Sequence, residues 1–284
     1  MRKKLSDIVV ALTLTAAVLG AMLIVQTPKT ALSGPRPQFA TIDGSRVYYE
    51  SHGQGAEALV FVHGWACDLT FWRLQVPDLK KYRALFVDLP GHGKSDKPQI
   101  AYTQDLFARS LHEVLRSAGV ERAILVGHSL AGLVVREFSR IYPVKTRAVV
   151  IVDGTFGPLG SADFLRGLDY LKAASRLIDG LFIPQTPSVL REEIKSKMLR
   201  TPQHVMVSAW QESNDAKIWK GDKIEVPVLA IYSTMWSSRA ENFIWRIGTS
   251  PEYRELAGVG HFLMMEKPKE FNEILMGFLS KHKF

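Results

Sequence analysis

Short apolar runs alternate with segments of helical spacing along most of the chain. Continuous apolar runs of about four to eight residues are typical of strands that are buried on both faces of a parallel sheet. Such runs occur at residues 58–62, 84–87, 123–126, 148–152 and 228–232. Apolar residues at helical spacing occupy residues 104–117, 130–141 and 269–280. The alternation predicts an α/β fold, in which a mostly parallel sheet is covered by helices on both faces.

Two segments near residue 43 alternate polar and apolar positions instead. Residues 39–42 and 46–50 flank the pair Asp43-Gly44. An Asp-Gly pair between two alternating segments predicts a β-hairpin, because both residues tolerate the positive φ that tight hairpin turns need. A further short strand is expected at residues 253–256, before the last helix.

Residues 156–223 interrupt the alternation of strands and helices. The stretches 162–174, 188–199 and 202–212 have helical patterns, and the segment lacks strand-like runs of the same quality as those elsewhere. About 70 residues is long for an ordinary connection between two strands. The segment therefore predicts a helical lid inserted between two strands of the sheet, and a pair of plain crossover helices is the alternative.

The N-terminus combines a basic tip with a long apolar run. Arg2-Lys3-Lys4 precedes an apolar stretch from Ile8 to Val25, and no clean cleavage site follows it. This order is typical of an export signal, and the length approaches the ~20 residues that span a bilayer. Residues 1–27 are therefore expected to be a signal peptide or an N-terminal membrane anchor. A buried core helix is the remaining alternative.

The residues after the apolar run complete the predicted organisation. Residues 28–37 are rich in proline, which predicts a linker. Residues 38–284 are expected to form the main domain. Because a basic tip stays in the cytoplasm, the main domain is expected on the periplasmic or extracellular side of the inner membrane. It is either exported across that membrane or anchored in it, so the membrane is a predicted partner if the segment is uncleaved.

Composition narrows the class of protein further. Of the 284 residues, 46% are hydrophobic, which suffices for one large globular core. The net charge of +8 is scattered among acidic residues and forms no basic run with interleaved aromatics, so nucleic-acid binding is not expected. A single cysteine, Cys67, excludes a disulfide within the chain and a cysteine-rich metal site.

One hexapeptide carries the strongest chemical signal. It reads Gly127-His128-Ser129-Leu130-Ala131-Gly132, and it stands where an apolar run ends and a helical stretch begins. A serine on such a sharp strand-to-helix turn projects its hydroxyl above the sheet edge. Ala131 replaces the glycine of the strict G-x-S-x-G pattern, which is a mild departure. Ser129 is therefore the predicted nucleophile.

The chain from about residue 39 to the end resembles the α/β-hydrolase superfamily, and in particular its lidded esterase, epoxide-hydrolase and dehalogenase-like branch. The stretches that carry the resemblance are, in chain order, His63-Gly64-Trp65, Asp88-Leu89-Pro90-Gly91-His92-Gly93-Lys94-Ser95, Gly127-His128-Ser129-Leu130-Ala131-Gly132 and Gly258-Val259-Gly260-His261-Phe262. The resemblance implies an eight-stranded, mostly parallel sheet over residues 38–284 with an inserted lid at about 156–223.

The resemblance also implies how a developing oxyanion is held. The backbone N–H of Trp65 is one implied donor and that of Leu130, next after the nucleophile, is the other. Fixed donors aimed at the oxyanion stabilise the transition state of acyl transfer. His63 is expected to support its loop, and Asp88 is implied to be a structural residue.

A serine hydroxyl is a weak nucleophile and needs a general base. His261 lies late in the chain, between the predicted strand 253–256 and the last helix. The family places its histidine at this point, so His261 is the implied base.

The acid that orients His261 is the least obvious member of the predicted catalytic triad. Most of the family carries it after the strand equivalent to 228–232, but Trp236 occupies roughly that place here. Asp153 ends the strand 148–152, one helix and one strand after Ser129, so it is expected at the same sheet edge. Asp153 is therefore the predicted acid, a position that dehalogenase-like relatives use. Glu241, and a weak or absent acid, are the alternatives.

Together these residues predict a serine hydrolase that needs no metal and no organic cofactor. The expected substrate is a small or medium apolar carboxylic ester, cleaved through an acyl-enzyme. Lactone, amide, thioester or C–C bond hydrolysis with the same triad is the alternative within enzymes. Halide displacement and epoxide hydrolysis are disfavoured, because those branches need Asp where this chain has Ser129. A slow-turnover ligand-binding receptor or scaffold is the alternative of another class, and the oligomeric state is open.

Overall fold

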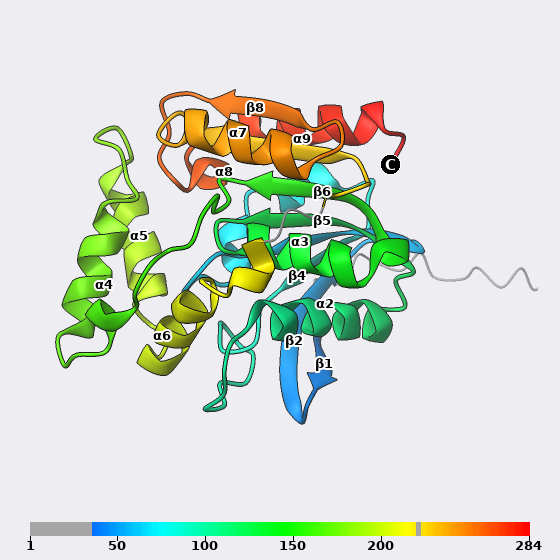
Figure 1. Ribbon diagram of the computed structural model, residues 1–284. Coiled ribbons are helices and arrows are strands. Elements are labelled where there is room, and N and C mark those ends of the chain that lie inside the picture. The colour runs from blue at the N-terminus through cyan, green and yellow to red at the C-terminus, as the bar shows by residue number, and fades with distance from the viewer. Residues whose placement is uncertain (1–35, 220–222) are drawn as a thin grey trace, which may run out of the picture. The chain divides into compact units, whose positions relative to one another are not determined.

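The computed structural model describes residues 36–219 and 223–284, and the strands in these ranges form one eight-stranded sheet (Figure 1). The strands are β1 (Arg36–Ile42), β2 (Ser45–His52), β3 (Glu57–Val62), β4 (Ala84–Val87), β5 (Arg122–His128), β6 (Thr146–Val152), β7 (Val228–Ser233) and β8 (Glu252–Leu256). Their order in the sheet is β1-β2-β4-β3-β5-β6-β7-β8. The pairs β1–β2 and β2–β4 are antiparallel and the others are parallel. The predicted fold class is confirmed.

The antiparallel edge begins with the expected hairpin. Asp43 and Gly44 have φ values of 47° and 80°. Positive φ at both central residues matches the right-handed twist of the two flanking strands, which explains the Asp-Gly pair.

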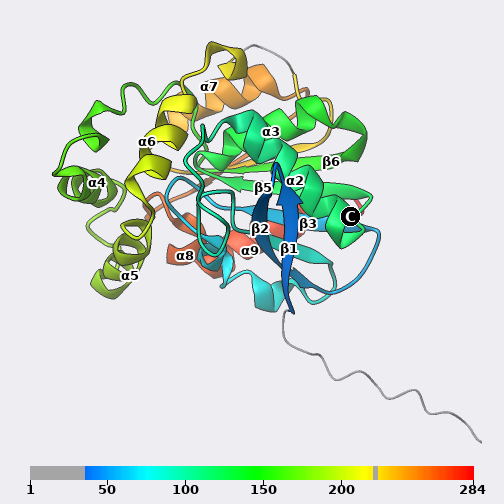
Figure 2. The ribbon, with the colours of Figure 1, turned by 90° about the horizontal axis from the view of Figure 1, so that it is seen from below.

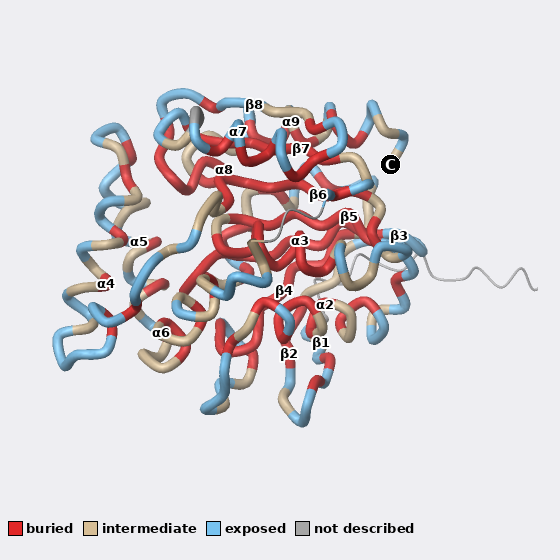
Figure 3. The backbone as a smooth tube through the Cα atoms, viewed as in Figure 1, coloured by how far each residue is buried: buried red, intermediate tan, exposed pale blue. Residues whose placement is uncertain are grey.

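Helices cover both faces of the sheet (Figure 2). One face carries α2 (Gln104–Ala118), α3 (Ala131–Ile141) and α7 (Ser237–Ile247). The other carries α8 (Leu263–Glu266) and α9 (Pro268–Lys281). Because both faces are covered, the central strands are almost wholly buried (Figure 3). This rigid core holds the carboxyl ends of the parallel strands in fixed positions.

Between β6 and β7 the chain forms a helical insertion, residues 156–219. It contains α4 (Tyr170–Asp179), α5 (Ser188–Met198) and α6 (Gln203–Glu212), which lie beyond the carboxyl ends of β5 and β6 (Figure 1). Residues 220–222 of the predicted lid lie outside the described ranges. That the insertion covers a bound substrate as a lid stays a prediction.

The first helix of the insertion differs from its predicted bounds of 162–174. Residues 163–165 form a single 3₁₀ turn, and α4 begins only at Tyr170. The side chain of Gln203 donates to the carbonyls of Leu165 and Gly167 at 2.8 and 3.2 Å. These carbonyls are thus bound by a side chain from α6, and the α-helix starts after them.

The predicted localisation needs correction. The expected signal or anchor, residues 1–27, lies outside the described residues. The longest described helix, α2, has 15 residues, fewer than the ~20 that cross a bilayer. Within 36–219 and 223–284 no helix has the length and apolarity to span a membrane, because the apolar runs there build the sheet and its covering helices. The prediction of a protein exported across or anchored in the inner membrane is therefore wrong on this finding.

Candidate active site

Ser129 lies on a sharp turn between β5 and α3, as the hexapeptide predicts. Its φ is 54°, in the left-handed region that residues other than glycine rarely adopt. The close approach of strand and helix requires Gly127, because a Cβ there would collide with the carbonyl oxygen of Ala131. The Ser129 N–H donates to the carbonyl of Val152 at 2.9 Å, which joins the turn to the neighbouring strand β6. The strained turn is therefore held by the sheet beside it.

Asp153 and His261 meet although 108 residues separate them in sequence. The His261 Nδ1 lies 2.7 Å from Asp153 Oδ2. Both residues are buried, and no part of the Asp153 side chain is exposed to solvent. In this geometry the carboxylate fixes the imidazole ring and leaves its Nε2 for other chemistry.

Two neighbours of this pair were missed by sequence reasoning. Ser233, at the end of β7, donates its backbone N–H to Asp153 Oδ1 at 2.7 Å, and its hydroxyl lies 3.3 Å from Oδ2. The Nε2 of His128 lies 2.9 Å from the carbonyl oxygen of His261. Burial lowers the pKa of His128 well below its usual value, so the ring is neutral and donates from Nε2 to that carbonyl. The sequence does place Ser233 and His128 at strand ends, near Asp153 and Ser129, and this position was the signal that could have identified them.

The predicted oxyanion donors also lie at this place. Trp65 and Leu130 line the same cavity as Ser129. Neither backbone N–H donates to a backbone carbonyl among the described residues. Two free N–H groups next to a serine hydroxyl suit the stabilisation of a developing negative charge.

His63 and Asp88 brace the loops around the site. Burial lowers the pKa of His63 to about 4, so its ring is neutral. Its Nε2 accepts from the Leu89 N–H at 3.0 Å while Nδ1 donates to Gly64 at 2.8 Å. Asp88 accepts the backbone N–H groups of Leu69 and Lys94 at 2.7 and 2.8 Å, and its burial raises its pKa to about 6. Both side chains are hydrogen-bonded to backbone groups of the surrounding loops.

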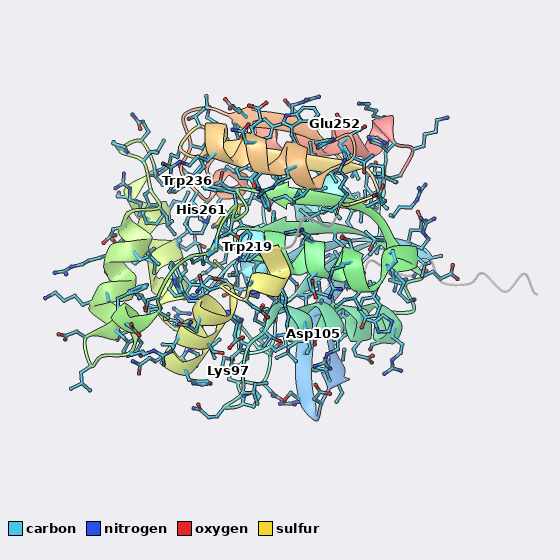
Figure 4. All side chains as sticks on the ribbon, in the orientation of Figure 1. Lys97, Asp105, Trp219, Trp236, Glu252 and His261 are labelled. Atoms are coloured by element: carbon cyan, nitrogen blue, oxygen red, sulfur yellow. The ribbon has the colours of Figure 1, made fainter. Side chains whose placement is uncertain are left out.

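The alternative acid lies elsewhere. Glu241 is exposed on α7, where its Oε1 accepts from the indole N–H of Trp245 at 3.3 Å. Trp236, which stands where most of the family carries the acid, instead lines the cavity with His261. Figure 4 shows Trp236 and His261 between the sheet and the helical insertion. The structure thus brings Asp153, and not Glu241, to His261.

A cavity of about 310 Å³ contains these groups. The sheet side contributes the polar groups, and the helical insertion and nearby loops contribute apolar ones. The apolar lining includes Trp65, Phe156, Leu159, Leu177, Leu181, Met198, Trp210, Trp236 and Phe262. No lysine or arginine belongs to its described lining. The cavity therefore suits an uncharged, apolar molecule.

The described ranges hold no cluster of three or more His, Cys, Asp or Glu side chains that could bind a metal ion. Cys67 lies just beyond the predicted oxyanion donor and is buried. Burial raises the pKa of its thiol well above the usual value, so it is held as a neutral thiol.

The chain is similar in sequence to several known proteins. One relative is the dihydrolipoyllysine-residue acetyltransferase component of the acetoin cleaving system of Cupriavidus necator, 33% identical over 141 residues. That match covers 49% of this chain and 37% of the relative, so the chain spans little more than a third of it. A second is the 2-hydroxy-6-oxononadienedioate/2-hydroxy-6-oxononatrienedioate hydrolase of Paraburkholderia phymatum, 26% identical over 83% of this chain and 91% of the relative.

Among solved structures, this chain is similar to Est816, described as an N-acyl homoserine lactone degrading enzyme. The TM-score is 0.75 with 26% identity, over 85% of this chain and all of the other. Residues 59–274, well over half of the chain, match the alpha/beta hydrolase family. The protein is thus an enzyme of the alpha/beta hydrolase family.

Proposed function

We propose that the protein is a serine hydrolase that cleaves carboxylic esters through an acyl-enzyme. The observation that carries the proposal is the 2.7 Å contact between Asp153 and His261 at the wall of the cavity that Ser129 also lines. A buried carboxylate on Nδ1 holds the imidazole in the tautomer whose Nε2 can accept a proton.

In the proposed reaction the Ser129 hydroxyl attacks the ester carbonyl carbon while His261 Nε2 takes its proton. The resulting oxyanion accepts from the N–H groups of Trp65 and Leu130. The tetrahedral intermediate collapses, and the imidazolium returns the proton to the departing alcohol oxygen. Water, deprotonated by His261, then attacks the acyl carbon, and the imidazolium returns that proton to Ser129 Oγ as the carboxylic acid is released. Asp153 stays ionised and stabilises the imidazolium throughout.

The composition of the cavity supports an uncharged substrate of small or medium size. Its apolar lining favours an acyl or alcohol group without polar substituents. A substrate carboxylate would be buried there without a cationic partner, which is costly. This disfavours a dicarboxylate such as the one in the name of the Paraburkholderia relative's substrate. The insertion is proposed to act as the lid that shields the acyl-enzyme from bulk solvent.

Other bonds remain candidates for the same residues. The likeness to a lactone-degrading enzyme favours a lactone as the second candidate, because a lactone is a cyclic ester and needs no further group. Amides and thioesters use the same steps with a different leaving group.

A panel of substrates tests the proposal. The purified chain should hydrolyse short-chain p-nitrophenyl esters, and the Ser129→Ala variant should retain no activity above the uncatalysed rate. Matched neutral lactones, anilides and thioesters should react more slowly than the best ester. Full activity in Ser129→Ala would show that Ser129 is not the nucleophile. A wild-type protein that prefers lactones would show that lactones, and not open-chain esters, are the substrate class.

A further inference from the structure

The helical insertion is bonded directly to the predicted oxyanion loop, residues 63–67. Thr201, between α5 and α6, donates its hydroxyl to the carbonyl of Ala66 at 3.1 Å. The indole N–H of Trp65 donates to the carbonyl of Met206 in α6 at 2.9 Å. Both bonds are buried, and Thr201 itself is only 6% exposed. The insertion is thus bonded both to Trp65, which supplies one predicted oxyanion donor, and to Ala66 directly after it.

The same insertion is bonded to the histidine loop, residues 257–262. The backbone N–H of His261 donates to the carbonyl of Leu181 at 2.9 Å. Thr186, 4% exposed, donates its hydroxyl to Glu266 Oε2 at 2.8 Å. Both oxygens of Glu266 lie 3.0 Å from the backbone nitrogen of Gly260. A buried threonine therefore connects the insertion, through one carboxylate, to the residue before His261.

Both loops have conformations that their surroundings must maintain. Ala66 has a φ of 57°, in the left-handed region that disfavours a residue with a Cβ. Gly260 lies so close to the insertion that a Cβ there would come within 2.7 Å of the Leu181 carbonyl oxygen. A strained backbone such as that of Ala66 persists only where neighbouring groups fix it. The insertion supplies part of this support, through Thr201 at the oxyanion loop and through Leu181 at the histidine loop.

We propose that Thr201 and Thr186 are positioning residues, which orient the oxyanion loop and the histidine loop for the reaction. The insertion is then a fixed part of the reaction centre as well as its cover. Neither hydroxyl touches the substrate. This inference rests on the proposed serine hydrolase chemistry, and it adds that two buried threonines of the insertion set the geometry of the transition state.

Loss of a positioning contact has a specific kinetic signature. A displaced oxyanion donor weakens binding of the tetrahedral transition state and leaves binding of the planar ester almost unchanged. The effect then falls on kcat, with KM constant. A boronic acid forms a tetrahedral adduct with the serine oxygen and mimics that state, so its inhibition constant should rise by the factor by which kcat/KM falls.

Thr201→Val and Thr201→Ser form a matched pair, because valine keeps the branched shape and loses the hydroxyl while serine keeps the hydroxyl. We expect Thr201→Val to lower kcat about tenfold, since it removes one buried hydrogen bond that aims a donor. KM should stay within about twofold, and a phenylboronic acid should bind about tenfold more weakly. Thr201→Ser should stay close to wild type. The pair Thr186→Val and Thr186→Ser should behave in the same way.

Hydrogen–deuterium exchange gives a readout that does not depend on turnover. Thr201→Val should speed exchange of the peptide that contains residues 63–67, and Thr201→Ser should not. A wild-type protein without esterase activity would contradict the proposed function, and the exchange result would still test the contact between Thr201 and Ala66. The inference is overturned if Thr201→Val equals wild type in both kcat and exchange. It is also overturned if valine and serine cause equal losses, or if the loss falls on KM while boronate binding is unchanged.

Discussion

The two regions that meet at the cavity are built in different ways. At the sheet edge, residues 127–132 and 153–155, backbone geometry sets the positions of the side chains. Ser129 and Asp153 both have positive φ, 54° and 44°, at the ends of buried parallel strands. In the helical insertion, positions depend on single contacts between side chains and distant backbone, such as Thr201 with Ala66. Geometry of the first kind follows from a short motif, whereas geometry of the second kind follows only from the assembled fold.

The largest expected effect tests the sheet edge. Asp153→Asn should lower kcat on the order of 10³–10⁴-fold, because the amide cannot hold His261 in the required tautomer. Stopped-flow or steady-state hydrolysis of a p-nitrophenyl ester measures it. Glu241→Gln is the matched control, and it should change kcat by less than about twofold because Glu241 is exposed on α7. The opposite pattern would make Glu241 the acid.

The buried histidines of the sheet side predict a loss of stability in acid. Burial lowers the pKa of His63 to about 4, that of His92 to about 3 and that of His128 well below its usual value. The unfolded chain therefore binds more protons below pH ~6.5, so the stability these residues provide is present above that pH and is lost as the pH falls towards the folded pKa values. Asp88, whose pKa is raised to about 6, opposes part of the loss.

The net result should be a decrease of a few kcal/mol in the free energy of unfolding between pH 7 and pH 5. Urea titration followed by tryptophan fluorescence measures it at each pH. A free energy that stays constant across this range would mean that the sheet-side histidines are not held neutral.

A pair of glycine substitutions compares the two regions directly. Gly127→Ala should destabilise the protein by about 1–3 kcal/mol and reduce activity, because the new Cβ meets the Ala131 carbonyl oxygen at the turn. Gly167→Ala, in the insertion, places its Cβ in open space and should change stability by less than about 0.5 kcal/mol. Thermal melting of both variants provides the measurement. Equal shifts in Tm would contradict the account of a rigid turn.

The smallest expected effect is on substrate binding. Leu177 lines the cavity from α4, so Leu177→Ala should remove apolar contact with the acyl or alcohol group. We expect KM for a medium-chain ester to rise about three- to tenfold, with kcat within about twofold. Kinetics with a series of acyl chain lengths checks this, and an unchanged KM at every length would show that α4 does not contact the substrate.

The two regions also differ in how far the sequence predicts them. The strands, the hairpin and the turn at Ser129 could be predicted, because continuous apolar runs and small residues at fixed spacing determine them locally. Asp153 could be placed beside His261 only by combining chain order with the rule that parallel strands share a carboxyl edge. The N-terminal apolar run was interpreted as a signal or membrane segment from local composition alone; it lies outside the described residues and stays a prediction, whereas the localisation inferred from it is corrected.

The missed residues share one property, which is that their partners are distant in sequence. Ser233 contacts a residue 80 positions away, and Thr201 contacts one 135 positions away. Similarly, α4 begins later than its helical pattern predicts, and the carbonyls of Leu165 and Gly167 before it accept from Gln203, which lies more than 35 residues further along the chain. No local pattern reports such contacts, since they exist only once the sheet and the insertion have packed.

Covalent labelling of Ser129 tests the central claim most directly. The wild-type chain, treated with a fluorophosphonate probe and analysed by intact mass and peptide mapping, should take up one probe molecule on Ser129. Ser129→Ala should take up none, and Asp153→Asn should react far more slowly at the same residue. Labelling that persists in Ser129→Ala, or a wild-type chain that remains unlabelled, would contradict the assignment of Ser129, His261 and Asp153 as a catalytic triad.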